Sequence, residues 1–166
     1  MEKSQRAFTL VELLVVITII AILSAIGLVN YTQVTKSGRD AKRLSDLKQV
    51  QSALEQYFAD QFFYPSQAVS PPLTFGSAFS NSTGNPNPPV IGKTYLNALP
   101  CDPTTGNCSP DITGIQYCYL PLPAGCNNNP TTKCLNYKLY AKLENLAEGN
   151  GECGGYNKYN LEVTRP

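Results

Sequence analysis

Histidine is absent from the 166 residues of this chain, and no two of its cysteines stand in a Cys-x-x-Cys spacing. The first absence excludes zinc sites with mixed cysteine and histidine ligands, and the second gives no support to a zinc ribbon or a thioredoxin-like redox site. The sequence also lacks a nucleophile motif, a phosphate-binding glycine motif and an acidic pair with metal-ligand spacing. We therefore predict that the chain is not an enzyme and carries no cofactor.

A strong excess of charge of either sign is missing as well. The net charge is +1, from 13 basic and 12 acidic residues, and this balance gives no indication of a specific nucleic-acid partner. Ten tyrosines and six phenylalanines indicate packing in a core and at contact surfaces. Hydrophobic residues make up 42% of the chain, and many of them stand in one N-terminal run, so the remainder is rather polar.

Within that run, from Phe8 to Val29, Glu12 is the single charged residue. These 22 residues would span about 33 Å as an α-helix, which matches the roughly 30 Å hydrocarbon core of a bilayer. A carboxylate at hydrocarbon depth is costly unless it has a partner, so Glu12 is a candidate functional residue. The segment predicts a membrane span, and a cleaved export signal that ends near Ala25 is the alternative.

The start of this segment resembles the processing site of type IV prepilins and type II secretion pseudopilins, in the residues Arg6-Ala7-Phe8-Thr9-Leu10-Val11-Glu12. The resemblance implies a leader peptide, residues 1–7, which a prepilin peptidase cleaves between Ala7 and Phe8 before Phe8 is N-methylated. It also implies that Glu12 pairs with the amine of Phe8 on a neighbouring subunit during filament assembly. The family usually has glycine before the cut, where this chain has Ala7.

The resemblance implies a topology too. The chain would cross the cytoplasmic (inner) membrane once, with a cytoplasmic N-terminus, before an inner-membrane assembly platform moves it into an extracytoplasmic pilus or pseudopilus. Six cysteines after the span agree with an oxidising extracytoplasmic compartment. The basic residues favour the opposite orientation by the positive-inside rule, because two precede the span and five follow it, namely Lys36, Arg39, Lys42, Arg43 and Lys48.

Apolar residues at helical spacing continue beyond the span. We divide the predicted helical region into a transmembrane and assembly half, residues 8–29, and an amphipathic half, residues 30–64. The second half carries an apolar stripe at spacings of three and four residues, formed by Leu44, Leu47, Val50, Leu54 and Phe58. The charged residues of this half, including Arg43 and Asp46, would occupy other faces. They would be solvated there, or would contact neighbouring subunits or lipid headgroups.

Proline, serine and asparagine are frequent in residues 65–94, which predicts an irregular surface loop. Aromatic-rich alternating segments in residues 95–166 predict short strands, at 115–120, 137–143 and 159–163. The predicted fold class is α+β: a long N-terminal helix packed on a small antiparallel sheet, which buries Leu47, Val50 and Leu54. Such a small sheet gains stability from covalent cross-links.

Two segments of this C-terminal region extend the resemblance to pilin and pseudopilin heads. Residues 95–103 read Tyr-Leu-Asn-Ala-Leu-Pro-Cys-Asp-Pro and are similar to a "YLxxLPxDP" stretch of that family. Residues 137–144 read Tyr-Lys-Leu-Tyr-Ala-Lys-Leu-Glu and resemble its "YxLxAxLE" strand. The resemblance therefore implies a pilin-like head.

The six cysteines predict disulfides, for which 15 pairings are possible. A turn-rich loop between Cys101 and Cys108 can bring these two together. Cys118 and Cys134 stand equally far from Cys126 in sequence, as they would at the base of a hairpin, and this leaves Cys126 for Cys153.

The loop of residues 148–160 occupies the place of a calcium loop in many major pseudopilins, where several aspartates supply oxygens. This chain offers two carboxylates there, Glu148 and Glu152, and the neutral side chains of Asn150, Asn157 and Asn160. Calcium takes six to eight oxygen ligands and binds more tightly as carboxylates are added. The sequence therefore does not favour calcium, and Cys153 could hold the loop instead.

Together these observations predict a structural subunit of a type IV pilus-like filament. Identical subunits would form a homopolymer through packing of their N-terminal helices after leader cleavage. One alternative is a type II secretion pseudopilin that forms a short periplasmic pseudopilus. Another is a membrane-anchored extracytoplasmic binding module that does not polymerise.

Overall fold

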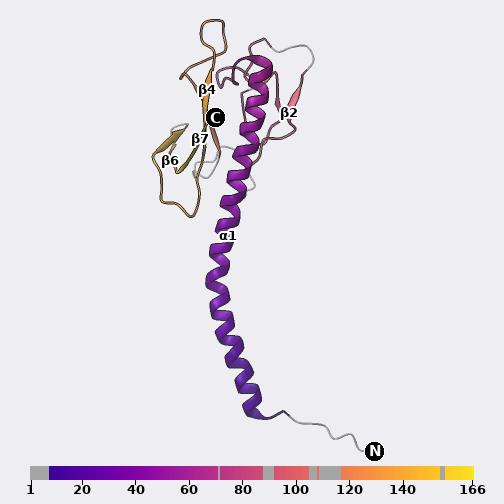
Figure 1. Ribbon diagram of the computed structural model, residues 1–166, viewed down its shortest axis with the longest axis vertical. Helices are drawn as coiled ribbons and strands as arrows, with labels where there is room; N and C mark the ends of the chain where they lie inside the picture. The colour runs from indigo at the N-terminus through magenta and orange to yellow at the C-terminus, as the bar shows by residue number, and fades with distance from the viewer. Residues whose placement is uncertain (1–7, 71, 88–91, 105–107, 109–116, 154–155) are drawn as a thin grey trace, which may run out of the picture. The chain divides into compact units, whose positions relative to one another are not determined.

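The computed structural model describes residues 8–70, 72–87, 92–104, 108, 117–153 and 156–166, with the side chains of 28–30 and 156–157 outside the description (Figure 1). The chain divides at Gly38 into two compact units, which we call the stem, residues 1–38, and the head, residues 39–166. A continuous helix, α1 (Leu10–Gln61), begins in the stem and ends in the head. The leader, with Ala7, lies outside the described residues.

From Leu10 to Ile26, the stem part of α1 carries apolar side chains on every face. Its large hydrophobic side chains are exposed at 49–78% from Leu10 to Ile26. By length and composition, α1 can cross a membrane. A helix that is hydrophobic all round needs an apolar environment, so the predicted membrane-spanning character agrees with the structure.

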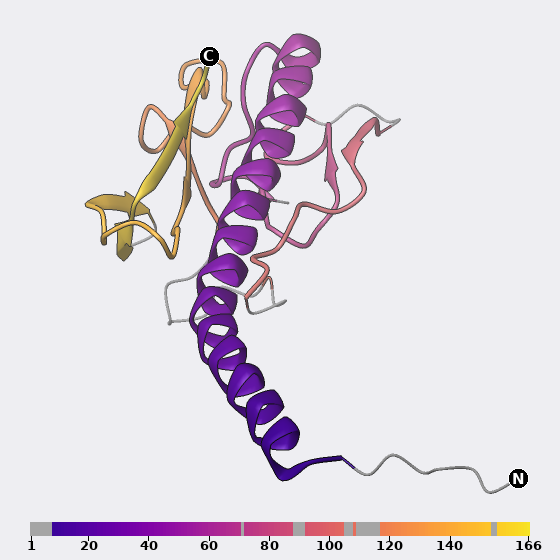
Figure 2. The same ribbon diagram turned by 60° about the horizontal axis from the view of Figure 1, so that its bottom comes forward.

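Short antiparallel strands form the sheets of the head (Figures 1 and 2). A three-stranded sheet has the order β3-β4-β7, built from Cys118–Leu122, Asn136–Ala141 and Leu161–Thr164. Two smaller pairs are β1 with β2 and β5 with β6, built from Phe79–Ser80, Thr94–Leu96, Gly151–Cys153 and Tyr156–Tyr159. In both views β4 and β7 lie on one side of the head part of α1 and β2 lies on the other.

The predicted α+β class is confirmed, and the three predicted strands correspond to β3, β4 and β7. Their bounds differ by up to three residues, and positions 115–116 of the first lie outside the described residues. The pairs β1–β2 and β5–β6 were not predicted, because they are short and lack an alternating apolar pattern. The start of β2 and all of β1 fall within residues 65–94, where we expected irregular structure.

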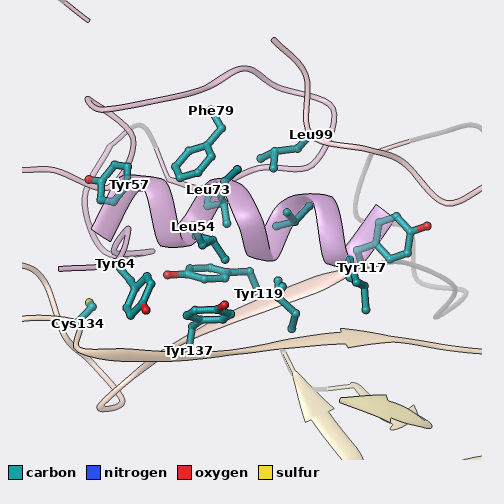
Figure 3. Packing of buried hydrophobic residues seen from close by; sticks show 14 of the residues in the cluster. Leu54, Tyr57, Tyr64, Leu73, Phe79, Leu99, Tyr117, Tyr119, Cys134 and Tyr137 are labelled. Atoms are coloured by element: carbon teal, nitrogen blue, oxygen red, sulfur yellow. The ribbon is translucent and has the colours of Figure 1, made fainter. Parts of the chain in front are cut away.

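The core of the head surrounds α1. Leu47, Val50 and Leu54 are fully buried, which confirms the central part of the predicted stripe, whereas Leu44 at its start is 39% exposed. Other side chains pack against α1 from two opposite sides (Figure 3). Tyr119 and Tyr137 come from β3 and β4 on one side, and Phe79 of β1 lies on the other side with Leu73 and Leu99 of the connecting segments.

Part of the 65–94 segment is hydrogen-bonded to the rest of the head, whereas we predicted a solvated surface loop. The side-chain amide of Asn128 donates to the backbone carbonyls of Tyr64 and Gly84, at 2.8 Å each. Gly84 has φ +61°, and a Cβ there would lie 2.3 Å from the backbone nitrogen of Ser66, so glycine is required. Several polar side chains of the segment are buried, namely Ser66, Asn81, Thr83 and Asn85.

All six cysteines are paired, but two of the three predicted pairs are wrong. Cys101 bonds Cys108 as predicted, whereas Cys118 bonds Cys153 and Cys126 bonds Cys134. The register of the β3–β4 hairpin explains the error, because Cys118 lies opposite Tyr140 at the end away from the turn. Cys126 and Cys134 both lie in the connection between these strands, where they close a short loop.

Candidate functional site

Thr9 and Glu12 bond each other at the start of α1. The backbone N–H and the hydroxyl of Thr9 donate to Glu12 Oε2, at 2.9 and 2.8 Å, and Thr9 Oγ1 accepts from the Glu12 N–H at 3.2 Å. This reciprocal arrangement is a capping box, which satisfies N–H groups that the first helical turn leaves unpaired. We did not predict this capping box, although the Thr-x-x-Glu spacing of the sequence is its signal.

The capping box occupies one oxygen of the Glu12 carboxylate and leaves the other open. Both Thr9 donors use Oε2, and no described residue donates to Oε1. Phe8, which precedes the cap, is 88% exposed. The predicted assembly residues Phe8 and Glu12 thus lie at the N-terminal end of the stem, with a carboxylate oxygen available to a donor from outside.

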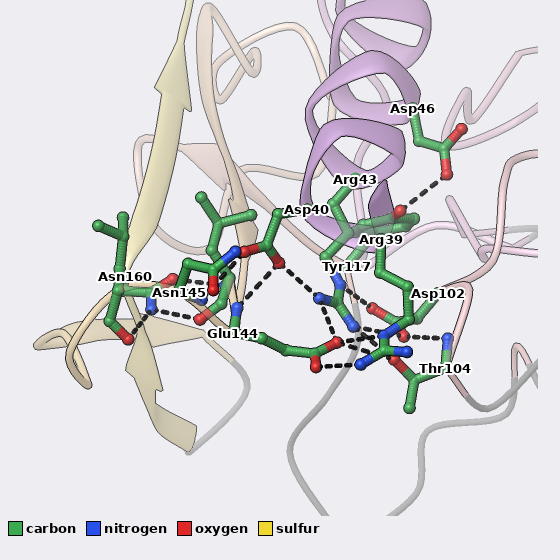
Figure 4. Close-up of polar contacts among 12 residues, drawn as sticks. Arg39, Asp40, Arg43, Asp46, Asp102, Thr104, Tyr117, Glu144, Asn145 and Asn160 are labelled. Atoms are coloured by element: carbon green, nitrogen blue, oxygen red, sulfur yellow. Dashed lines mark hydrogen bonds and ion pairs between the residues drawn. The ribbon is translucent and has the colours of Figure 1, made fainter. Parts of the chain in front are cut away.

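A second polar site, which we call the Arg43 cluster, lies in the head (Figure 4). The Arg43 guanidinium is fully buried and donates five hydrogen bonds. Nε donates to Asp102 Oδ2 at 2.7 Å, Nη1 donates to Asp40 and Glu144 at 2.8 and 2.9 Å, and Nη2 donates to Asp102 Oδ1 and Thr104 Oγ1 at 3.1 and 2.6 Å. A buried charge is tolerated only with such complete pairing.

Further contacts join the cluster to the rest of the head. Asp40 accepts the backbone N–H groups of Glu144 and Asn145, at 2.8 and 3.0 Å. Arg39 Nε donates to Glu144 Oε1 at 2.6 Å. Glu144 thus accepts hydrogen bonds from the guanidinium groups of Arg39 and Arg43, and its backbone N–H donates to Asp40. These contacts join the segment after β4 to α1.

The position of Arg43 corrects our expectation for the charged residues of the amphipathic half. Arg43 and Asp46 do not lie on a solvated face; they are buried beside the apolar stripe, and Asp46 accepts the Tyr117 hydroxyl at 2.8 Å. Arg43 stands four residues before Leu47 and continues its face, as helical spacing requires. Two of the three compensating charges, Asp102 and Glu144, come from the two head segments that resemble the family motifs.

The electrostatics of the cluster favour the ionised forms of Arg43 and Glu144. Burial disfavours the charged form of Arg43, but the hydrogen bonds to Asp102 and Glu144 outweigh it and raise the pKa of the guanidinium. The hydrogen bond from Arg39, opposed by burial and supported by Arg43, lowers the pKa of Glu144 to about 2. Arg43 and Glu144 therefore stay charged across the physiological pH range.

Two candidate calcium ligands of the 148–160 loop, Glu148 and Asn160, bond other parts of the head. Glu148 Oε1 already faces Lys142 and Lys158, at 3.1 and 3.6 Å. The amide nitrogen of Asn160 instead faces the carbonyls of residues 143, 146 and 147, at 2.8–3.2 Å. Among the described residues, no group of three or more carboxylates or cysteines is placed to hold a metal. The side chain of Asn157 lies outside the description.

Comparison with known proteins identifies the family. A family model for the prokaryotic N-terminal methylation motif matches residues 3–28. The type II secretion system core protein G of Pseudomonas aeruginosa is 32% identical over 102 residues, which cover 61% of this chain and 69% of that protein. The chain belongs to the type IV pilin and type II secretion pseudopilin family.

Other pilins and pseudopilins are similar to this pilin-family chain. Core protein G of Dickeya chrysanthemi is 32% identical over 106 residues, 62% of this chain and 65% of that protein. A fimbrial protein of Pseudomonas aeruginosa is 30% identical over 81 residues, 49% of this chain and 53% of that protein. The chain thus spans between about half and about two thirds of these relatives. No solved structure gives a significant match.

Proposed function

We propose that this pilin-family chain is a structural subunit of a type IV pilus-like filament that assembles through packing of its N-terminal helices. The observation that carries the proposal is the exposed apolar surface of the stem from Leu10 to Ile26. Lipid covers that surface before assembly, and the stems of identical subunits cover it afterwards. The contact is heterologous and does not close, so repeated addition gives a filament.

Maturation precedes assembly in this proposal. A prepilin peptidase removes residues 1–7 by cutting between Ala7 and Phe8, and Phe8 is then N-methylated. The matched methylation motif at residues 3–28 supports this step. The leader faces the cytoplasm, α1 crosses the inner membrane once, and an inner-membrane assembly platform extracts the subunit with its head on the extracytoplasmic side.

Glu12 sets the position of each incoming subunit. After cleavage, Phe8 carries a free amine, and the open Oε1 of Glu12 on a neighbouring copy can accept it while Oε2 stays in the capping box. In an apolar environment, such an ion pair is far stronger than in water, and either charge alone is strongly disfavoured. The pairing therefore selects one axial position over all others.

Two conservative variants separate this charge role from the helix-capping role. Glu12→Gln keeps an acceptor for the capping box, because glutamine also serves there, but it removes the charge. Thr9→Val removes the cap and keeps the carboxylate. We expect Glu12→Gln, like Glu12→Ala, to be cleaved normally but to yield no sedimentable filaments, and Thr9→Val to retain some assembly. Normal filaments from Glu12→Gln would refute the pairing.

The second candidate function is that of a type II secretion pseudopilin, which the similarity to two core proteins G favours. A deletion strain of the native host tests it. Loss of sheared surface filaments with an unchanged set of secreted proteins supports a pilus, and loss of protein secretion supports a pseudopilus. A chain that is cleaved and membrane-bound but never sediments as a filament would instead be a non-polymerising anchored module.

A further inference from the structure

The Arg43 cluster depends on residues that one disulfide encloses. Three of the five hydrogen bonds of the Arg43 guanidinium go to Asp102 and Thr104, and both stand in sequence between Cys101 and Cys108, which are bonded to each other. Thr104 also donates its backbone N–H to Asp102 Oδ1 at 2.8 Å, which orients the carboxylate toward the guanidinium.

The disulfide itself packs against Gly76. A Cβ at Gly76 would lie 2.6 Å from Cys108 Cβ and 2.7 Å from its sulfur, and Gly76 has φ +85°. The Gly76 N–H donates to the carbonyl of Leu99 at 2.9 Å, two residues before Cys101. Gly76 therefore contacts the chain near both ends of the disulfide, and these contacts hold Asp102 at a defined position.

Loss of this position has a large electrostatic consequence. Arg43 and the side chain of Asp102 are 0% and 2% exposed, so neither can turn to water without a rearrangement of the head. Removing one partner of a buried ion pair is strongly destabilising because the other charge stays buried. The first residues to open would be 39–46 of α1, which begin the head and include Arg43.

We propose that the Cys101–Cys108 disulfide is a redox-sensitive switch that controls whether the head holds α1 through Arg43. In the oxidised form, Asp102 and Thr104 bind Arg43. A dithiol reductant converts the disulfide to two thiols and becomes a disulfide itself, with two electrons and two protons transferred to the protein. The reduced form frees Asp102, and residues 39–46 open locally. The proposal uses the proposed function only in placing the head in an oxidising compartment.

The chain offers a matched control. Cys126 and Cys134 are separated by 8 residues and Cys101 and Cys108 by 7, so removing either disulfide releases a similar loop-closure entropy. The enclosed residue Asn128 binds Tyr64, Gly84 and Cys134 and makes no contact with Arg43. A purely entropic effect would therefore be alike for the two disulfides.

The first experiment compares two double variants of the full chain in detergent micelles. Amide hydrogen exchange of residues 39–46 is measured by mass spectrometry in Cys101→Ser/Cys108→Ser and in Cys126→Ser/Cys134→Ser. We expect exchange at least about tenfold faster in the first variant than in the second. Equal exchange in the two variants would overturn the proposal. The readout needs no filament, so it is independent of the proposed function.

The second experiment avoids any variant of the cysteines. Coupling between two sites is reciprocal, so weakening the Arg43 contact must make Cys101–Cys108 easier to reduce. Reduction is followed by differential alkylation in the wild type and in Asp102→Asn. We expect the reduction equilibrium of Cys101–Cys108 to shift about tenfold, with Cys126–Cys134 unchanged. An unshifted Cys101–Cys108 equilibrium would refute the switch, even if the serine variants fail to fold.

Discussion

The stem and the head place the same kinds of side chain in opposite environments. In the stem, large apolar residues are about half to three quarters exposed and Glu12 satisfies only its own cap. In the head, a charged arginine is fully buried while the leucines of α1 pack beside it. The described core of the head is therefore formed within one copy of the chain, whereas the apolar side chains of the stem have no cover within that copy.

Two leucines of α1 test this difference most strongly. Leu54→Ala in the head removes a fully buried side chain and should lower the free energy of unfolding by about 2–5 kcal/mol. Leu14→Ala in the stem, where the leucine is 50% exposed, should change head unfolding by less than about 0.5 kcal/mol. Denaturant unfolding followed by tyrosine fluorescence measures both. A large loss of head stability in Leu14→Ala would contradict the distinction.

We expect the next largest loss of head stability from a change in the Arg43 cluster. Asp102→Asn keeps the shape of the side chain but leaves the buried guanidinium without its main counter-charge, so we expect a loss of about 3 kcal/mol. The control is Glu162→Gln, because Glu162 pairs with Lys138 at 3.0 Å on the surface, with both side chains more than a third exposed. That pair should contribute less than about 1 kcal/mol. Similar losses in the two variants would mean that burial does not matter here.

The sites of these two predictions differ in how much of their structure the sequence pattern predicts. The helix, its apolar stripe and the main sheet follow from local periodicity, and Leu47, Val50 and Leu54 were placed correctly. The buried state of Arg43 could not be predicted, because only Asp40 among its counter-charges is close in sequence, and Asp102 and Glu144 stand 59 and 101 residues away. Nothing in the local sequence says that these segments meet.

The disulfide errors have a similar cause. Pairing by sequence distance placed the hairpin centre at Cys126, whereas the register of Cys118 with Tyr140 places it at residue 129. A shift of three residues moved Cys134 away from β3 and next to Cys126. Local spacing was sufficient for Cys101 and Cys108 because their loop closes on itself. At the candidate site, the exposure of the stem follows from composition. We did not predict the capping bond between Thr9 and Glu12, because the motif was interpreted only for processing and assembly.

Acid titration should distinguish the head further from the stem. The pKa of Glu144 is lowered from 4.5 to about 2 in the folded head, chiefly by the hydrogen bond from Arg39. A lowered folded-state pKa gives stabilisation that is complete above the unfolded pKa and is lost as the pH falls through the folded one. Glu144→Gln should therefore be less stable than the wild type at neutral pH, and the difference should shrink between about pH 4.5 and pH 2. A constant difference in urea unfolding across that range would exclude the effect.

Phe62 is the head residue that most resembles the stem, and it should give the smallest effect. It follows the last residue of α1 with φ +62°, a conformation that costs a non-glycine residue about 1–2 kcal/mol, and its side chain is 71% exposed. Asparagine adopts this conformation more readily and exposes no apolar surface. Phe62→Asn should therefore stabilise the head by about 1 kcal/mol. Phe63→Asn is the contrasting control, because Phe63 packs against the core and its loss should destabilise. If Phe62→Asn also destabilises the head in the full chain, Phe62 contributes packing there, and the contrast between a buried head core and an exposed stem does not hold at the end of α1.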